Sequence, residues 1–208
     1  MIIDKLLDKT YCVDCKDGLK ILPDDSIDLV FTDPPYLKKT LYCYDYLADL
    51  CPRVMKRGAS LLTIVGHYAL SIVMPKFEGK LKYRWILCMN QFEGSHSRMA
   101  MGIEVMWKPI LWFVKDAYPQ GRGFLRDGIV IEGRAGQTKK LHKWEQDLDW
   151  CLYYIEKLCP IGGIVCDPFM GSGTVALACK KLERHFIGFD TDPEACKTAN
   201  DRVEEVSN

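Results

Sequence analysis

The segment that most constrains the fold of this chain covers residues 162–190. It reads GGIVCDPFMGSGTVALACKKLERHFIGFD, which divides into a β-branched run, a glycine-rich turn, a helix-forming stretch and a second apolar run. A strand that passes through a tight turn into a helix, and then into another strand, is the repeating unit of a parallel sheet. The segment therefore predicts an α/β fold in which helices cover a mostly parallel sheet.

The rest of the chain continues this alternation. Short β-branched or aromatic runs predict strands at 27–32, 60–65, 82–90, 109–115 and 128–131. Apolar residues at intervals of three and four predict helices around 47–54 with Gly58 as the stop signal, over 67–77 with a break near Pro75, through 141–155, and over 193–206. No internal repeat or linker interrupts the pattern. We expect one domain over residues 1–208, with a doubly wound sheet that carries an antiparallel hairpin at one edge.

The composition excludes several classes of protein. Lysine and arginine together number 28, as do aspartate and glutamate, so the formal net charge is zero and nucleic-acid binding would have to rest on a local basic patch. No apolar run approaches the roughly 20 residues that span a bilayer, and the first ten residues lack the apolar core of a signal peptide, so we expect a cytoplasmic protein. Cys12 and Cys15 form the only C-x-x-C pair among ten cysteines, which is too few ligands for zinc, so no metal site is expected.

The glycine turn of the first segment has the features of a nucleotide-type binding corner. Gly171 and Gly173 allow the backbone to approach a ligand, and a helix that begins at Thr174 offers free N–H groups. Asp190 ends the following strand, where it can bind the two hydroxyls of a ribose. One interpretation is a dinucleotide-binding enzyme, because GSGTVA fits the G-x-G-x-x-A fingerprint of dehydrogenases. Asp167 would repel a pyrophosphate, however, and a carboxylate at this position suits the cationic cofactor S-adenosylmethionine.

A second motif lies in the stretch FTDPPYL at residues 31–37. Taken alone, it indicates a turn, because proline fixes its own φ and pushes the residue before it out of the helical region. An acid and two prolines therefore end the buried strand at 27–32. The glycine turn far downstream supplies a reason for this rigidity beyond the turn itself.

Together, TDPPY at 32–36, DPFMGSGT at 167–174 and FIGFD at 186–190 resemble the motifs of the DNA amino-methyltransferases, in the permuted beta-type order that places the catalytic motif before the cofactor motif. The segments MWKPILWFVK at 106–115 and HKWEQ at 142–146 are similar to those of short phage and prophage members. The resemblance implies a Rossmann-like, S-adenosylmethionine-dependent methyltransferase that modifies an exocyclic amino group in DNA by base flipping and direct in-line transfer, as in restriction–modification systems. An initial Asp in the DPPY motif favours adenine. Cytosine-N4 methylation and a catalytically inactive nucleic-acid-binding relative remain as alternatives.

The implied chemistry explains the residue types of the DPPY motif. The amino nitrogen of adenine is a poor nucleophile because its lone pair is delocalised into the ring. The carboxylate of Asp33 and the carbonyl of Pro34 can accept both N–H hydrogens, and the two prolines, Pro34 and Pro35, hold these acceptors rigid. Tyr36 offers a ring on which a base flipped out of the duplex can stack. These four residues are the expected catalytic residues, and no cysteine is required.

Further site residues follow from the resemblance and from the distribution of charge. The resemblance implies a cofactor site formed by Asp14, Asp33, His142, Gln146, Asp167, Pro168, Phe169, Gly171, Ser172, Gly173, Thr174 and Asp190. Basic residues in the loops predict DNA contacts by Arg98, Arg122, Arg126, Arg134, Lys139 and Lys140. Residues 116–141 form a short loop-rich insertion, the candidate target-recognition region. DNA is the expected partner, in a bacterial or phage-infected cell, and a homodimer is an option because family members often dimerise.

Overall fold

The computed structural model describes residues 3–90, 97–98, 102–117, 123–129 and 148–207. Within these ranges the main sheet contains β1 (Lys9–Cys12), β2 (Ile27–Thr32), β3 (Met55–Ile64), β4 (Lys82–Asn90), β7 (Trp107–Val114), β8 (Gly128–Ile129), β9 (Ile164–Asp167) and β10 (His185–Asp190). A separate two-stranded ribbon pairs β5 (Ser97–Arg98) with β6 (Glu104–Val105). The helices are α1 (Cys15–Ile21), α2 (Cys43–Val54), α3 (Leu70–Val73), α4 (Leu148–Leu158), α5 (Thr174–Lys181) and α6 (Pro193–Ser207). Short 3₁₀ turns are η1 (Ile3–Lys5), η2 (Lys38–Thr40), η3 (His67–Ala69) and η4 (Met74–Phe77).

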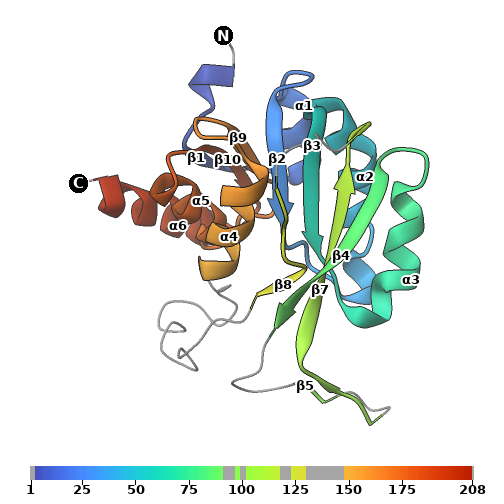
Figure 1. Ribbon diagram of the computed structural model, residues 1–208. Coiled ribbons are helices and arrows are strands. Elements are labelled where there is room, and N and C mark those ends of the chain that lie inside the picture. Colours follow the sequence, from blue (N-terminus) through green and yellow to red (C-terminus); the bar gives the residue numbers. More distant parts are fainter. Residues whose placement is uncertain (1–2, 91–96, 99–101, 118–122, 130–147, 208) are drawn as a thin grey trace.

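The main sheet has the order β1-β10-β9-β2-β3-β7-β4-β8 (Figure 1). The strands from β1 to β3 in this order are parallel, whereas β7 runs antiparallel to both β3 and β4. The predicted Rossmann-like α/β fold, mostly parallel with an antiparallel hairpin, is therefore confirmed. The hairpin of β4 and β7 lies one strand in from the edge, because β8 pairs in parallel with β4.

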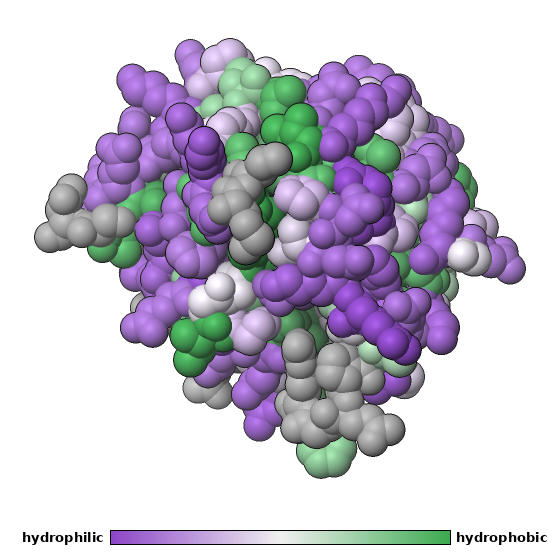
Figure 2. Space-filling view, turned by 90° about the horizontal axis from the view of Figure 1, so that it is seen from above, coloured by the Kyte–Doolittle hydropathy of each residue, from purple (hydrophilic) through white to green (hydrophobic). Residues whose placement is uncertain are grey.

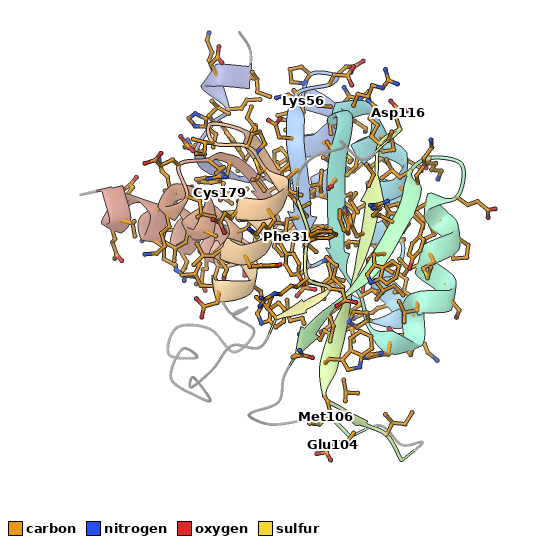
Figure 3. All side chains as sticks on the ribbon, in the orientation of Figure 1. Phe31, Lys56, Glu104, Met106, Asp116 and Cys179 are labelled. Carbon is orange, nitrogen blue, oxygen red and sulfur yellow. The ribbon has the colours of Figure 1, made fainter. Side chains whose placement is uncertain are left out.

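Helices cover both faces of the sheet, and each face has its own apolar core. Alternation along the strands divides the side chains: Val30 of β2 joins the core under α1, α2 and α3, while Leu29 and Phe31 join the core under α4, α5 and α6. Figure 1 shows the two helical layers, and Figure 3 shows Phe31 in the middle of the sheet with Cys179 on α5. Strands buried on both faces explain the continuous apolar runs of the sequence.

The predicted elements differ from the structure in their boundaries. Gly58 was expected to end a helix, but α2 already ends at Val54 and β3 begins at Met55. Gly58 has a φ of 79° and lies where the register between β2 and β3 shifts. The glycine therefore allows a bulge-like irregularity within β3 and does not end a helix. β8 occupies Gly128–Ile129 of the strand expected at 128–131, and α4 begins at Leu148. Residues 130–131 and 141–147 of these predictions lie outside the described residues.

Charged pairs dominate the end of the molecule at which β2 and β3 begin. Figure 2 looks onto this end and shows a mostly hydrophilic surface. Lys56 binds Asp28 at 2.7 Å, and Lys115 binds Asp25 at 2.6 Å. None of the helices in the described ranges combines the length and the apolar character that crossing a membrane requires. The opposite end of the sheet, where the parallel strands finish, carries both predicted motifs.

We expect Gly173→Ala to destabilise the fold by roughly 2–4 kcal/mol, from left-handed strain and a steric clash. Gly173 precedes α5 with a φ of 86°, and an added Cβ would lie 2.7 Å from the Cβ of Ala199 in α6. Gly171→Ala is the matched control, because its φ is also positive at 53° but nothing lies within 4 Å of its Cβ position. Urea unfolding should show a smaller loss for the control, and equal losses would contradict the role assigned to the contact between α5 and α6.

Candidate active site

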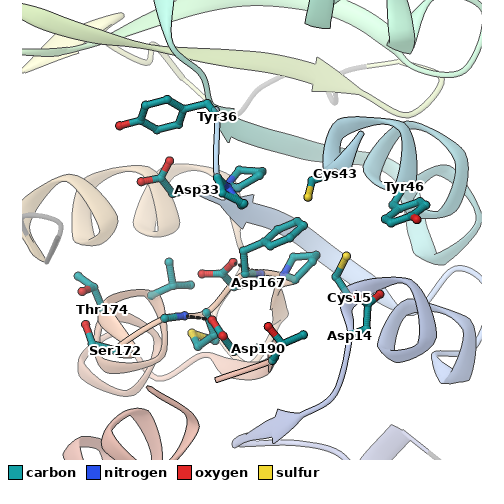
Figure 4. Close-up of a pocket in the computed structure, with 18 of the residues that line it drawn as sticks. Asp14, Cys15, Asp33, Tyr36, Cys43, Tyr46, Asp167, Ser172, Thr174 and Asp190 are labelled. Atoms are coloured by element: carbon teal, nitrogen blue, oxygen red, sulfur yellow. Dashed lines mark hydrogen bonds between the residues drawn. The ribbon is translucent and has the colours of Figure 1, made fainter. Parts of the chain in front are cut away.

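Three carboxylates lie at the carboxyl ends of three neighbouring strands. Asp33 follows β2, Asp167 ends β9, and Asp190 ends β10. The order β10-β9-β2-β3 reverses the direction of strand addition between β9 and β2, which is where open α/β sheets bind their ligands. Figure 4 shows the three side chains around one cavity.

This cavity has a volume of about 570 Å³ and brings the two sequence motifs together. All four predicted catalytic residues, Asp33 to Tyr36, line it. The predicted cofactor residues that line it are Asp14, Asp33, Asp167, Pro168, Phe169, Gly171, Ser172, Thr174 and Asp190. Gly173 lies behind the turn against α6, and His142 and Gln146 lie outside the described residues.

Asp167 is the most deeply buried of the three acids, with only 3% of its surface exposed. Its Oδ1 accepts hydrogen bonds from the hydroxyl of Thr32 at 2.6 Å and from the backbone N–H of Phe169 at 3.0 Å. Burial raises the pKa of Asp167 to about 7, and the charges of Asp190 and Asp33 add to the rise against these two bonds. No ion pair joins this carboxylate to a lysine, arginine or histidine within the described residues, and a cationic ligand could supply the missing positive charge.

Asp190 supports the glycine turn in addition to facing the cavity. Its Oδ2 accepts a hydrogen bond from the N–H of Gly171 at 2.8 Å, and its Oδ1 accepts one from the N–H of Asp192 at 3.0 Å. Each carboxylate oxygen has a further lone pair, so Asp190 can still accept from ribose hydroxyls. The sequence predicted the ribose contact but gave no sign of the bond to the turn.

The far wall of the cavity comes from α1 and α2. Asp14 is the N-cap of α1, and its Oδ1 accepts from the N–H of Lys16 at 2.8 Å. Cys15 and Cys43 line the wall beside it, and Figure 4 shows their sulfur atoms across from each other. Burial, with the charge of Asp14, raises the pKa of Cys15 to about 12, so this thiol is protonated and acts as an apolar surface.

Residues 33–36 form the loop after β2, which we name the catalytic loop after its predicted role. Asp33 and Tyr36 project from the same side of this loop, as Figure 4 shows. The Nζ of Lys108, on β7, lies 5.9 Å from the centroid of the Tyr36 ring. The hydroxyl of Tyr68 donates a hydrogen bond to the backbone carbonyl of Tyr36. A planar group stacked on the Tyr36 ring would thus have the Asp33 carboxylate beside it.

The predicted DNA-binding residues are only partly described. Arg126 is exposed beside β8, where its backbone N–H donates a hydrogen bond to the hydroxyl of Tyr153 at 2.8 Å. Together with Arg84 and Trp85, it lines a second hollow of the surface. Arg98 lies on β5, of which only the backbone is described. The predicted contacts that lie outside the described residues are Arg122, Arg134, Lys139 and Lys140.

Sequence reasoning missed three lysines close to the catalytic loop. Lys38 and Lys39 are exposed on η2, directly after the loop, and Lys108 reaches Tyr36 from β7. The signal was present as a basic pair immediately after DPPYL and a lysine in MWKPILW. It was hidden because isolated lysines are the usual content of a solvated surface.

The chemistry of the cavity distinguishes between its candidate ligands. None of the described residues that line it is a lysine, arginine or histidine, whereas four are aspartates. A pyrophosphate would meet only like charge there, which argues against a dinucleotide. The sulfonium and amino groups of S-adenosylmethionine are cationic and suit the acids, and Phe169 and Tyr46 offer apolar walls. No group of three or more histidine, cysteine, aspartate or glutamate side chains in the described ranges is arranged to hold a metal ion.

A Rossmann-like sheet with an acidic cavity where its strand order reverses is the architecture of an S-adenosylmethionine-dependent methyltransferase. A family model described as DNA methylase matches residues 27–201, and the chain belongs to this family of DNA amino-methyltransferases, which modify N6 of adenine or N4 of cytosine. The matched range includes both motifs and three of the four aspartates of the cavity, Asp33, Asp167 and Asp190, whereas Asp14 precedes it.

Individual relatives agree with this assignment. The chain is 24% identical to the type II methyltransferase M.HpaI of Haemophilus parainfluenzae, over 96% of this chain and 75% of that protein. The crystal structure of an M1.HpyAVI–SAM complex is similar with a TM-score of 0.77 and 25% identity, over 94% of this chain and 98% of that one. The cytosine-N4-specific PvuII DNA methyltransferase shares the fold with a TM-score of 0.78 and 16% identity, over 95% and 89% of the two chains. S-adenosylmethionine is the cofactor of this family and of this chain.

Proposed function

We propose that this chain methylates the N6 amino group of adenine in DNA. The observation that carries the proposal is that Asp33 to Tyr36 and Asp167 to Thr174 line a single cavity, although they lie far apart in the sequence. The fold does not choose between the two bases, because a cytosine-N4-specific enzyme has the same architecture. The choice of adenine rests on the aspartate that begins the DPPY motif.

The catalytic loop supplies acceptors for the amino group. The carboxylate of Asp33 and the carbonyl of Pro34 accept the two N–H hydrogens of the target nitrogen, which pulls it towards tetrahedral geometry. No described residue donates a hydrogen bond to the Pro34 carbonyl, which leaves that oxygen available. Tyr36 stacks on the flipped base. S-adenosylmethionine supplies the methyl group, and rigid acceptors lower the reorganisation required as charge develops on the nitrogen.

The cofactor site divides its ligand among several elements. We assign Asp167 to the cationic amino acid end, Asp190 to the ribose, and Asp14 to the adenine end, with Phe169 packed on the cofactor. The turn from Gly171 to Thr174 gives the backbone close access. His142 and Gln146 are proposed to border the methionine end.

DNA binding is proposed to rest on local basic groups, because the net charge of the chain is zero. Lys38 and Lys39 on η2 lie beside the catalytic loop and join the basic residues proposed from the sequence, which are Arg98, Arg122, Arg126, Arg134, Lys139 and Lys140. Residues 116–141 are proposed to recognise the target site within a single domain. We further propose action in the cytoplasm on bacterial or phage DNA, as part of restriction–modification, and association as a homodimer.

Transfer of labelled methyl groups to unmethylated DNA, followed by separation of the nucleosides, tests the proposed function. We expect the label in N6-methyladenine. A label in N4-methylcytosine would overturn the choice of base. If the protein binds S-adenosylmethionine but transfers no labelled methyl group to DNA of mixed sequence, the result would support the alternative of a catalytically inactive DNA-binding relative. Asp49→Asn, a change on an exposed part of α2 outside the cavity, should leave incorporation unchanged.

A further inference from the structure

Two of the four residues of the catalytic loop have no backbone N–H that could hold the loop in place. Pro34 and Pro35 have no N–H groups, so the backbone between Asp33 and Tyr36 lacks the donors with which a turn normally binds itself. Proline rings fix φ at two positions, but the direction of each carbonyl also depends on ψ. The aim of the Asp33 carboxylate and the Pro34 carbonyl therefore depends on partners outside the loop.

The carbonyls that follow Pro34 have such partners. The Oγ1 of Thr40 lies 2.7 Å from the carbonyl oxygen of Pro35 and 2.9 Å from that of Leu37. The N–H of Thr40 donates to the same Leu37 carbonyl at 2.8 Å. The hydroxyl of Tyr68 donates to the carbonyl of Tyr36. Side-chain hydroxyls thus contact three successive carbonyls, those of Pro35, Tyr36 and Leu37.

The two hydroxyls come from different parts of the fold. Thr40 ends η2, which follows the loop in the chain, whereas Tyr68 lies on η3, which follows the neighbouring strand β3. Gly66, between β3 and η3, lies against both rings, because an added Cβ would be 3.3 Å from Tyr36 and 3.2 Å from Tyr68. The loop is therefore fixed to the sheet from both sides.

We propose that Thr40 and Tyr68 are positioning residues that direct the acceptors of the catalytic loop at the target amino group. The proposal rests on the roles assigned above to Asp33 and Pro34. Loss of either hydroxyl frees one carbonyl and allows the loop to rotate, while the cofactor contacts of Asp167 and Asp190 stay in place. The two hydroxyls thus act on the chemical step, through the loop, and touch neither substrate.

Thr40→Val and Tyr68→Phe test the proposal, because each removes a hydroxyl and keeps the size and shape of the side chain. We expect kcat for methyl transfer to fall roughly 10–100-fold in each variant, since a misplacement of about 1 Å has effects of this size. The dissociation constant for S-adenosylmethionine should stay within about twofold of the parent value, because the pocket walls are unchanged. Thr40→Ser keeps the hydroxyl and should therefore retain most of the parent kcat.

Matched controls remove similar hydroxyls elsewhere. The hydroxyl of Tyr11 donates to the carbonyl of Lys5 at 3.3 Å, and the hydroxyl of Thr198 donates to that of Glu194 at 2.8 Å, both outside the cavity. Tyr11→Phe and Thr198→Val should keep the parent kcat. Single-turnover kinetics, calorimetric titration of the cofactor and thermal unfolding are measured on all the proteins.

The outcomes separate the positioning proposal from the proposed function. Parent-like kcat in both Thr40→Val and Tyr68→Phe would overturn the positioning roles and leave the methyltransferase assignment intact. A loss of kcat that is matched by weaker cofactor binding or by a lower unfolding temperature would also overturn them, because it would indicate general damage. An unmodified chain that methylates neither base would overturn the proposed function, and the positioning roles with it.

Discussion

Asp33→Asn is expected to lower kcat for methyl transfer by at least roughly 10²–10³-fold, the usual effect of removing one preorganised electrostatic group. Asparagine has the shape of aspartate but carries no charge, so it stabilises less of the positive charge that develops on the amino nitrogen. Its amide can also present N–H groups, which repel those of the target. The DPPY backbone should be undisturbed, because the prolines and the Thr40 and Tyr68 contacts remain.

Cofactor binding provides the internal control for Asp33→Asn. Asp167 and Asp190 remain in the cavity, so the dissociation constant for S-adenosylmethionine should change by less than about tenfold, the equivalent of 1.4 kcal/mol. Single-turnover transfer and calorimetric titration measure the two effects separately, with Asp49→Asn as the matched exposed control. A variant that keeps more than about a tenth of the parent rate would show that Asp33 is not the main acceptor.

Both motifs of the cavity could be predicted because their residues also have local structural signatures. Asp33 stands before two prolines at the end of an apolar run, and Gly171 and Gly173 separate a strand from a helix. Strand ends, turns and helix starts are visible in sequence, and in a parallel sheet they gather at one edge. Local patterns therefore indicated the strand ends and turns, and the resemblance to the DNA amino-methyltransferases joined the two motifs into one site.

Elements stabilised by distant partners could not be predicted. β1 is only four residues long, and its two ends are exposed. It is fixed to α6 by the side-chain amide of Asn200, whose Oδ1 accepts from the N–H of Thr10 at 2.9 Å and whose Nδ2 donates to the carbonyl of Thr10 at 3.0 Å. These residues are 190 positions apart, so no pattern within β1 or α6 indicates the pair. The bond from Thr32 to Asp167 spans 135 positions and was hidden for the same reason.

Asp167→Asn is expected to have opposite effects on cofactor binding and on stability. Without the carboxylate, the cationic end of S-adenosylmethionine loses a charge-assisted partner, so its affinity at pH 8 should fall roughly 10–100-fold. The same substitution removes a buried charge that no cation among the described residues pairs with when the cofactor is absent. Asparagine can still accept from Thr32 and from the N–H of Phe169, so the local bonds persist.

The pH dependence gives the sign of the stability effect. Burial raises the pKa of Asp167 from 3.8 to about 7 in the folded protein, so the folded state binds this proton more tightly than the unfolded state does. The contribution of Asp167 to stability is therefore greatest below about pH 4, declines as the pH rises to 7, and is constant above that value. At pH 8 the cofactor-free Asn variant should be more stable than the parent by about 2–4 kcal/mol, whereas near pH 4 the difference should vanish.

Cofactor titrations and urea unfolding at several pH values test both effects. Affinity of the parent for S-adenosylmethionine should fall up to about tenfold per pH unit below pH 7, because Asp167 must lose its proton before it can pair with the cation. The Asn variant should lack this dependence. An affinity of the parent that is constant between pH 6 and 8, or a variant that is less stable than the parent at pH 8, would mean that Asp167 is already ionised and compensated within the protein. The cavity would then not depend on a cationic ligand for its charge balance, and the assignment of Asp167 to the amino acid end of the cofactor would fail.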